Sequence, residues 1–240
     1  TSGQVCLKAC RGGYDGKGVW FPNNESELTA LVSDLSRRGV ALMAEEKVAL
    51  VRELSVLVAR TPSGEVATWP LTESVQRNGV CAEAVAPAPG VVPQLQQRAE
   101  TLGEKIATEL GVTGVLAVEL FAFANESGAE DIAVNELAMR PHNTGHWTQD
   151  GSVTSQFEQH LRAVLDLPLG PTDPRAPVSV MVNLLGSELA DPTTALPDVL
   201  ARCPRARVEL YGKEVRPGRK LGHVTVYGDD LEPARPEARL

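Results

Sequence analysis

Two glutamates stand inside segments that are otherwise apolar. Val115–Phe123 and Ile132–Leu137 have the composition of strands joined by a turn, so a hairpin would bring Glu119 and Glu136 face to face. Carboxylates inside apolar strands need compensation. Together with the neighbouring Asn135 they would offer hard oxygen ligands, which suit Mg²⁺ that bridges nucleotide phosphates. Two carboxylates on the solvated face of a hairpin would explain the same pattern.

A glycine-rich stretch follows the first predicted strand. Val5–Lys8 leads into Gly12-Gly13-Tyr14-Asp15-Gly16-Lys17-Gly18, in which four of seven positions are glycine. Because glycine lets backbone N–H groups approach an anion closely, this stretch could bind phosphate. It has neither the spacing of a Walker loop nor the helix that should follow a dinucleotide fingerprint. A plain glycine-rich hairpin turn therefore stays open as the alternative.

Histidines and cations gather in two further segments. The loop after the Glu136 strand carries Arg140, His142, Asn143 and His146. The segment from Tyr211 to Leu221 carries Lys213, Arg216, Arg219 and Lys220. Loops that follow strands commonly carry function, and clustered cations suit a phosphate-bearing substrate. His142 could donate a hydrogen bond or act as a general acid or base. A histidine that satisfies loop backbone, and a solvated run of charge, are the alternatives.

Periodicity and caps predict the elements that must position these residues. Asn24 caps a helix that ends before Gly39, and a second helical periodicity covers Leu95–Leu110. Val40–Met43 and Leu54–Ala59 are predicted to form a strand pair. The charged joint between these two strands is a candidate hinge between subdomains.

The last third of the chain is predicted to hold one helix and a small terminal unit. Ser155 and Glu158 form a capping box for a helix that bears Phe157, Leu161, Val164 and Leu165. A proline-rich linker follows at Pro168–Pro177. Short strands are then expected at Ser179–Leu184, Arg207–Leu210 and His223–Tyr227. From Glu232 onward, the composition predicts a weakly ordered tail.

Composition limits the class of protein. The 240 residues carry a formal charge of −8, which disfavours a general binder of nucleic acid or of a membrane surface. The four cysteines lack metal-ligand spacing, and no run approaches the ~18 apolar residues that a membrane span requires. These features predict a cytoplasmic protein. Because a strand begins at once and without a Met, we expect an N-terminal region to precede this sequence.

Five segments, taken in order, resemble the ATP-grasp family, and within it the family of N5-carboxyaminoimidazole ribonucleotide synthase, the ATPase subunit of phosphoribosylaminoimidazole carboxylase. They are GGYDGKG at 12–18, AVELF at 117–121, VNELAMRPHNTGHW at 134–147, TSQFEQHLRAVLDLPLG at 154–170 and KEVRPGRKLGH at 213–223. Each segment is a weak signal alone, but their order is specific and spans nearly the whole chain. Two departures are Met139, where a proline is usual, and Val19, where a glutamine is usual.

The resemblance implies roles for particular residues. Those implied to hold the ATP phosphates are Lys8, Gly13, Gly16 and Lys17. Those implied to contact adenine at the hinge are Glu45, Lys47 and Val48, with Glu53 as acceptor for the ribose hydroxyls. Glu119 and Glu136 would bind Mg²⁺, with Mn²⁺ as a substitute, beside Asn135. The residues implied to bind the ribonucleotide and the carboxylating species are Tyr14, Asp15, Arg140, His142, Lys213, Arg219 and, more weakly, Lys220.

The implied reaction is the ATP- and bicarbonate-dependent carboxylation of 5-aminoimidazole ribonucleotide, through carboxyphosphate, in de novo purine biosynthesis. The expected partners are these three small molecules and a second copy of the chain in a homodimer, with neither nucleic acid nor membrane. One alternative is another ATP-grasp ligase, such as the formate-dependent glycinamide ribonucleotide transformylase. A non-catalytic nucleotide-binding fragment is the other.

The implied fold is α+β, with two subdomains whose antiparallel sheets clamp ATP and a small β-rich C-terminal unit. The expected boundaries are a lid subdomain at 1–45, a larger subdomain with the Mg-ATP site at 46–167, and the C-terminal domain at 168–240. Members of this family normally begin with a nucleotide-fold domain of roughly a hundred residues. That domain is expected to be missing here, which would leave the ribonucleotide pocket incomplete.

Overall fold

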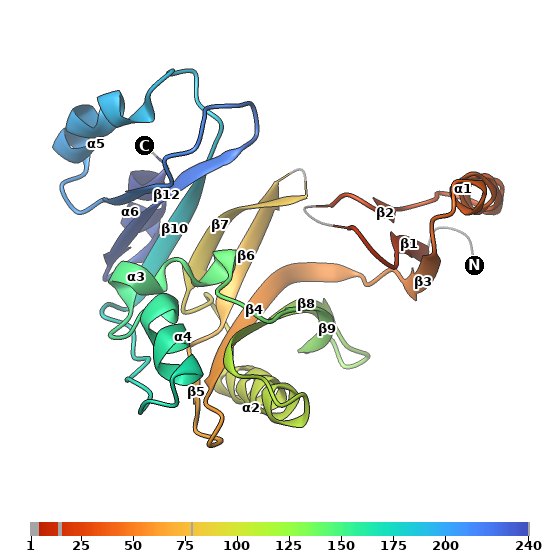
Figure 1. Ribbon diagram of the computed structural model, residues 1–240, viewed down its shortest axis with the longest axis horizontal. Helices are drawn as coiled ribbons and strands as arrows, with labels where there is room; N and C mark the ends of the chain where they lie inside the picture. Colours follow the sequence, from red (N-terminus) through yellow and green to blue (C-terminus); the bar gives the residue numbers. More distant parts are fainter. Residues whose placement is uncertain (1–4, 14–15, 78, 240) are drawn as a thin grey trace. The chain divides into compact units, whose positions relative to one another are not determined.

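The computed structural model describes residues 5–13, 16–77 and 79–239 (Figure 1). It combines helices with antiparallel strands, which confirms the expected α+β class. The chain divides into two compact units, of which the first reaches to Leu50 and includes Gln76–Val80. The second holds Val51–Val75 and the chain from Cys81 onward. Across these described residues, no helix has the length and apolar character needed to cross a membrane.

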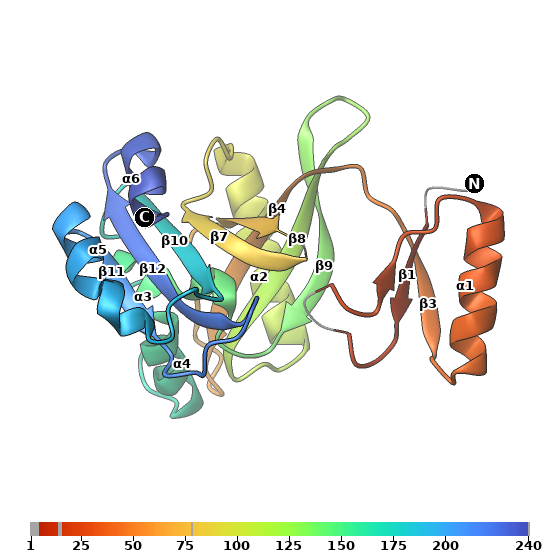
Figure 2. The same cartoon turned by 90° about the horizontal axis from the view of Figure 1, so that it is seen from above.

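The first unit is a small sheet with one helix. β1 (Val5–Ala9) lies between β2 (Val19–Trp20) and β3 (Leu42–Glu46), antiparallel to both. α1 (Glu25–Arg37) runs alongside this sheet (Figure 2). As the sequence predicts, Asn24 caps α1, because its Oδ1 accepts a hydrogen bond of 2.9 Å from the backbone N–H of Glu27.

The second unit is built on one continuous sheet. Over its described residues the strand order is β11-β12-β10-β7-β6-β4-β8-β9, with β5 paired to β4. The bounds are β4 (Leu50–Arg60), β5 (Val66–Thr68), β6 (Thr72–Arg77), β7 (Val80–Ala86), β8 (Gly114–Ala124), β9 (Glu130–Ala138), β10 (Val178–Leu185), β11 (Arg207–Leu210) and β12 (Lys220–Gly228). The helices are α2 (Pro93–Glu109), α3 (Thr148–Gly151), α4 (Gln156–Val164), α5 (Leu196–Arg202) and α6 (Leu231–Ala238), with 3₁₀ turns η1 (Asn143–Gly145) and η2 (Pro192–Ala195).

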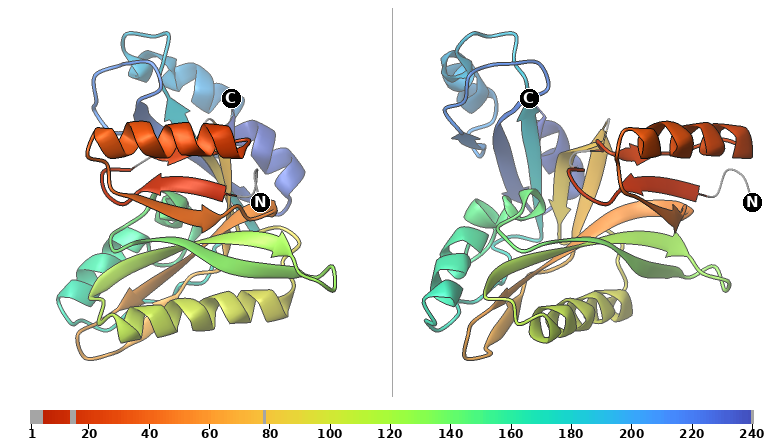
Figure 3. Two further views of the ribbon diagram at one scale, coloured as in Figure 1. Left: turned by 90° about the vertical axis from the view of Figure 1, so that its right-hand side faces the viewer. Right: turned by 45° about the vertical axis from the view of Figure 1, so that its right-hand side comes forward.

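Alternation along the central strands divides the core into two layers. On β4 and β8, residues such as Val56 and Val118 belong to the layer that packs against α2; Figure 3 shows α2 along this face. Their neighbours Leu57 and Ala117 belong to the opposite layer, which holds the fully buried Trp147. Because successive side chains of a strand point to opposite faces, Glu119 lies on the Trp147 side of β8.

The C-terminal strands extend the same sheet, because β10 pairs antiparallel with both β7 and β12. α6 covers this end of the sheet and is held there by ion pairs with a buried carboxylate on β7. Glu83 is 1% exposed, and its oxygens lie 2.6 Å from Arg235 Nε and 2.5 Å from Arg239 Nη2. The predicted disorder from Glu232 onward is therefore wrong: alanines buried on α6 and two arginines anchor this segment to the sheet.

The predicted pairing of Val40–Met43 with Leu54–Ala59 is also wrong. β3 pairs with β1 in the first unit, whereas β4 joins the large sheet of the second. The charged joint between them falls close to the boundary of the two units at Leu50. Its role as a hinge stays a prediction.

Candidate functional site

The hairpin of β8 and β9 brings the two predicted carboxylates together. Glu119 and Glu136 are direct cross-strand partners, which confirms that they face each other. The register shifts immediately afterwards, where Leu120 pairs with Val134, so Asn135 is the extra residue of a bulge. Like charges directly opposite each other destabilise a sheet. Two carboxylates at this place therefore favour a cation between them.

Glu119 also contacts the histidine loop. His142 Nε2 lies 3.0 Å from Glu119 Oε1, and its other ring nitrogen, Nδ1, lies 3.0 Å from Thr144 Oγ1. Thr144 in turn donates to Ser55 Oγ on β4 at 2.9 Å. A carboxylate oxygen can only accept, so Nε2 carries the proton in this contact. The imidazole is thus fixed in orientation at both nitrogens.

A buried glutamine holds the backbone of the same loop. Gln156, fully buried at the start of α4, accepts from His142 N–H and donates to the His142 carbonyl, both at 2.8 Å. A Cβ at Gly145 would collide with the Gln156 side chain, so this position requires glycine. Gln156 Nε2 also lies 3.1 Å from His146 Nδ1. One side chain therefore positions both histidines of the loop.

His146 belongs to a stack of rings that reaches the C-terminal strands. It stacks on His223 of β12 with a centroid distance of 4.8 Å, and on Phe157 at 5.7 Å. His223 Nδ1 is 2.7 Å from the hydroxyl of Tyr211. Burial lowers the pKa of His223 to about 4. Burial also lowers the pKa of His146 to about 3, assisted by His223, His142 and the nearby lysines of the basic segment.

The basic segment lies beside this stack. Lys213 Nζ is 4.8 Å from the ring centroid of Tyr211, and the charges of Lys213 and Lys220 are close enough to act on His146. Lys220 is also close to the buried thiol of Cys81, whose pKa is raised by burial. Arg219 donates to the backbone carbonyl of Glu214 at 3.2 Å. The structure thus brings the histidine loop and the predicted cations Lys213 and Lys220 together.

Two further predicted residues occupy positions around this centre. Glu53 of β4 pairs with Ser74 of β6, two residues before Ser55 and on the same face of the strand. Arg140 follows β9, is exposed, and donates to its neighbouring carbonyl of Pro141 at 3.1 Å.

Several residues in or beside the site were not predicted from the sequence. They are Ser55, Cys81, Thr144, Gln156, Tyr211 and His223. For Gln156 alone a signal existed, because a glutamine in the first turn of a capped helix, close in sequence to a histidine loop, can reach that loop.

The first unit carries the remaining predicted residues. Lys8 Nζ forms an ion pair of 2.6 Å with Glu45 Oε2 across β1 and β3. Lys47 Nζ lies 5.6 Å from the centroid of Phe21, and Val48 is half-buried.

The glycine loop of this unit needs its glycines. Gly12, Gly16 and Gly18 have φ of 77°, 74° and 78°, which only glycine adopts without strain, and a Cβ at Gly13 would lie 3.1 Å from the Lys17 carbonyl. Tyr14 and Asp15 lie outside the described residues.

The donor set indicates the kind of metal site. Within the described residues, no group of three or more His, Cys, Asp or Glu side chains is arranged to hold a metal ion. Mg²⁺, however, is commonly bound by one or two carboxylates and completes its shell with substrate phosphates and water. Glu119 and Glu136 therefore fit an ion shared with a nucleotide better than a closed structural site.

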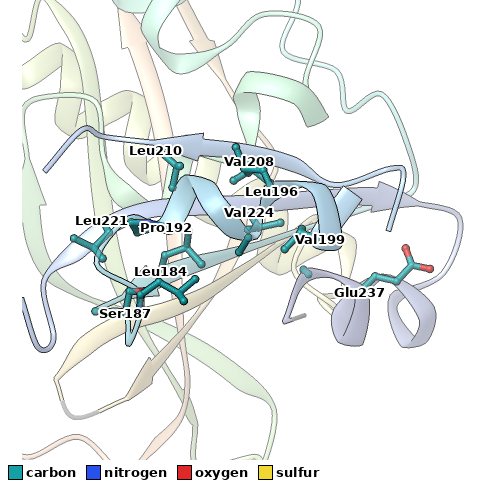
Figure 4. Close-up of a pocket in the computed structure, with 14 residues that line it drawn as sticks. Leu184, Ser187, Pro192, Leu196, Val199, Val208, Leu210, Leu221, Val224 and Glu237 are labelled. Atoms are coloured by element: carbon teal, nitrogen blue, oxygen red, sulfur yellow. The ribbon is translucent and has the colours of Figure 1, made fainter. Parts of the chain in front are cut away.

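A separate apolar cavity of about 150 Å³ lies between α5 and the strands β10, β11 and β12 (Figure 4). Among the described residues that line it, Glu237 is the only charged one. Its walls are aliphatic, for example Leu184, Leu196 and Val224. Such walls cannot bind phosphates, so this cavity is distinct from the site around Glu119.

Comparisons with known proteins agree with this geometry. The ATP-grasp domain family matches residues 2–157, and the phosphoribosylaminoimidazole carboxylase C-terminal domain matches residues 179–237. N5-carboxyaminoimidazole ribonucleotide synthase of Corynebacterium ammoniagenes is 79% identical over 242 residues, covering 100% of this chain and 59% of the relative. The enzyme of the same name from Mycobacterium tuberculosis is 51% identical over 232 residues, covering 95% of this chain and 53% of the relative.

Solved structures show the same fold. The N5-carboxyaminoimidazole ribonucleotide synthetase of Thermus thermophilus matches with a TM-score of 0.85 and 39% identity, covering 98% of this chain and 59% of that one. The Aspergillus clavatus synthase in complex with ADP and 5-aminoimidazole ribonucleotide matches with a TM-score of 0.83 and 32% identity, covering 98% and 60%. The chain thus spans between 53% and 60% of the length of these relatives. With more than half of its residues matched by the ATP-grasp domain, the chain belongs to the ATP-grasp family.

Proposed function

We propose that this protein carboxylates 5-aminoimidazole ribonucleotide to N5-carboxyaminoimidazole ribonucleotide, with ATP and bicarbonate as co-substrates, in de novo purine biosynthesis. It would act as an ATP-dependent carbon–nitrogen ligase in the cytoplasm, as a homodimer. The observation that carries the proposal is the contact of His142 with Glu119, opposite Glu136, in a site that continues to Lys213 and Lys220. The high identity to synthases of this name supports it.

The nucleotide would be bound by residues of several kinds. Glycine N–H groups of the 12–18 loop, with Lys8 and Lys17, suit the phosphates. Glu45, Lys47 and Val48 would contact adenine, and Glu53 would accept from the ribose. Glu119 and Glu136, beside Asn135, would hold Mg²⁺ (or Mn²⁺), which neutralises charge on the transferring phosphoryl group.

Bicarbonate would be activated first. One of its oxygens attacks the γ-phosphorus of ATP, the bond to the β–γ bridging oxygen breaks, and ADP leaves with that electron pair. Arg140 lies two residues beyond the end of β9 and is exposed, and its guanidinium would suit the bicarbonate or carboxyphosphate anion. Carboxyphosphate then breaks into CO₂ and phosphate. Exclusion of water from the site protects carboxyphosphate and CO₂ from reaction with water.

The second step would join carbon to nitrogen. The exocyclic amine of the ribonucleotide attacks the carbon of CO₂ and gives its proton to the phosphate that carboxyphosphate released, which leaves the carbamate product. His142 is placed to orient the reacting groups, because Glu119 and Thr144 fix its ring. Lys213, Arg219 and Lys220 would bind the phosphate of the ribonucleotide, together with Tyr14 and Asp15 of the glycine loop.

The test is removal of each carboxylate charge in the whole protein. Glu119→Gln and Glu136→Gln keep the size of the side chain but lose a metal ligand, so ATP turnover that depends on bicarbonate and the ribonucleotide should fall by about 10- to 100-fold or more. Glu126→Gln is the matched control, because Glu126 is an exposed glutamate at the turn of the same hairpin. Turnover near that of the parent in both site variants would exclude this assignment. So would a carboxylated product formed without bicarbonate.

A further inference from the structure

The apolar cavity beneath α5 lacks the partners that buried water needs. Among the described residues that line it, the only polar side chains are those of Ser187 and Glu237. The Ser187 hydroxyl oxygen already accepts from Leu189 N–H at 3.0 Å. The Glu237 carboxylate is already paired with Arg205 at 2.9 Å. A buried water typically makes about two to four hydrogen bonds, so this cavity favours a neutral, apolar occupant.

The size of the cavity suits a ligand with about the volume of one aromatic ring. An engineered protein cavity of about 150 Å³ with aliphatic and aromatic walls stays dry and binds benzene. The cavity beneath α5 has the same volume, about 150 Å³, and its walls have similar chemistry, as Leu196, Val208 and Val224 show in Figure 4. An empty cavity costs stability in proportion to its volume, because its walls lose van der Waals contacts. A bound apolar molecule would restore those contacts.

The wall that α5 forms can move to admit a ligand. No residue of α5 or of the preceding turn η2 is buried. A segment with few buried contacts opens at a low cost in free energy. The opposite wall is firm, because β12 lies between β10 and β11 and pairs with both of them. A ligand could therefore enter and leave beneath α5 without disturbing the sheet.

The same cavity lies at the base of the basic segment. The two ends of that segment are joined by a hydrogen bond of 2.8 Å from Tyr211 N–H to the Leu221 carbonyl. Leu221 lines the cavity, and so does Leu210, which precedes Tyr211. Gly186 lines it as well, and its N–H donates to the Arg219 carbonyl at 2.8 Å. A molecule in the cavity would therefore hold the base of the basic segment in place.

The strand β12 separates the cavity from the histidine stack. Val224 lines the cavity, whereas the preceding residue, His223, points to the other face of the strand and stacks on His146. A molecule in the cavity would therefore contact the base of the segment that carries Lys213 and Lys220 from the opposite face of the sheet. It would not compete with a substrate for these two cations.

We propose that this cavity is a binding site for a small neutral apolar molecule of about the size of benzene, and that the bound molecule stabilises the base of the basic segment. The proposal goes beyond the proposed reaction and does not depend on it, because the cavity and the histidine stack lie on opposite faces of β12. Both experiments below are done on the whole protein without substrates, so a failure of the proposed reaction would not affect them.

The first experiment titrates the protein with benzene by calorimetry. The parent should bind benzene saturably, with a dissociation constant of about 1 mM or lower. Val199→Phe places a ring of the ligand's own size in the cavity wall, so the affinity should fall at least about tenfold. Val92→Phe is the matched control, because Val92 is 54% exposed, precedes α2 and does not line the cavity. If Val199→Phe does not fold, Ala195→Leu in the same wall takes its place.

The second experiment measures amide hydrogen exchange with and without benzene. With benzene at about ten times its dissociation constant, the N–H groups of Tyr211 and Gly186 should exchange about tenfold more slowly, because opening there releases the ligand. The N–H of Ala9, bonded to Gly18 in the first unit, is the control and should not change.

Three results would overturn the proposal. A parent that binds no benzene would show that the cavity is closed or is filled by the protein itself. Equal binding by Val199→Phe and the parent would place benzene elsewhere. Unchanged exchange at both Tyr211 and Gly186 would show that the cavity does not act on the basic segment.

Discussion

The stacked pair His146 and His223 should make the protein lose stability as the pH falls from 7 to 5. Folding lowers the pKa of His146 to about 3 and that of His223 to about 4, in both cases chiefly by burial. In the unfolded chain both imidazoles titrate near the ordinary pKa of about 6.5. The unfolded state therefore binds more protons in this interval. The stability that the neutral pair contributes is complete above about pH 6.5 and is lost as the pH falls towards the folded pKa values.

The magnitude follows from proton binding alone. At pH 7 each unfolded imidazole is mostly neutral, whereas at pH 5 it is almost fully protonated and the folded one remains neutral. Integration between these limits gives about 2 kcal/mol for each histidine, or about 4 kcal/mol for the pair. Because both folded pKa values lie below 5, the result depends little on their exact position. Such a loss is a large fraction of the stability of an ordinary domain.

The assay is denaturant unfolding at pH 7 and pH 5, followed by tryptophan fluorescence, to which the buried Trp69 and Trp147 contribute. A His146→Phe, His223→Phe double variant keeps two stacked rings but cannot titrate, so its loss of stability over this interval should be about 4 kcal/mol smaller than that of the parent. Tyr211→Phe is the control, because it removes the partner of His223 without removing an imidazole, and it should keep the pH dependence of the parent. Equal losses in the parent and the double variant would refute the neutral buried pair.

Two further predictions concern the substrate side of the site. Lys213→Ala and Arg219→Ala should each weaken ribonucleotide binding by about one to two decades and leave ATP affinity unchanged, as measured by separate titrations. Arg216→Ala is the control and should change neither affinity, because Arg216 is an exposed arginine that pairs with a glutamate of the same loop. Equal weakening of ATP and ribonucleotide would contradict the assignment. Gly145→Ala should displace the buried side-chain amide of Gln156, which holds the backbone of His142. We therefore expect kcat to fall at least about tenfold while ATP affinity is retained. An unchanged kcat would show that the position of the loop is not critical.

The carboxylate pair could be predicted because it depends on local patterns. Strand alternation with a turn between the strands fixes which residues of a hairpin face each other, so Glu119 and Glu136 came together as expected. The bulge at Asn135 could not be predicted, because nothing in the composition of β9 marks an extra residue. The contact of His142 with Glu119 depends on tertiary structure and likewise has no sequence signal.

The periodicity of α4 shows a second limit of sequence reasoning. An apolar repeat locates a helix and its faces, but it does not say which face is buried. Here the buried face is chosen by the hydrogen bonds of Gln156 and Gln159, whose partners lie in segments before and after the helix. β6 was missed for a related reason, since Thr72–Arg77 is a mostly polar strand that is held by its neighbours in the sheet.

The buried Glu83 makes the order of synthesis matter for folding. Its two cationic partners, Arg235 and Arg239, follow it by 152 and 156 residues. Until those residues leave the ribosome, β7 can enter an apolar sheet only with an uncompensated charge or with a protonated carboxyl group, and each raises the free energy of the partly made chain. Early strands such as β4 and β8 can form a core with α2 before then, but the centre of the sheet is completed late. A growing chain should therefore expose the β7–β10 edge while the 152 residues between Glu83 and Arg235 are being made, a stage at which an unpaired strand invites chaperones or aggregation.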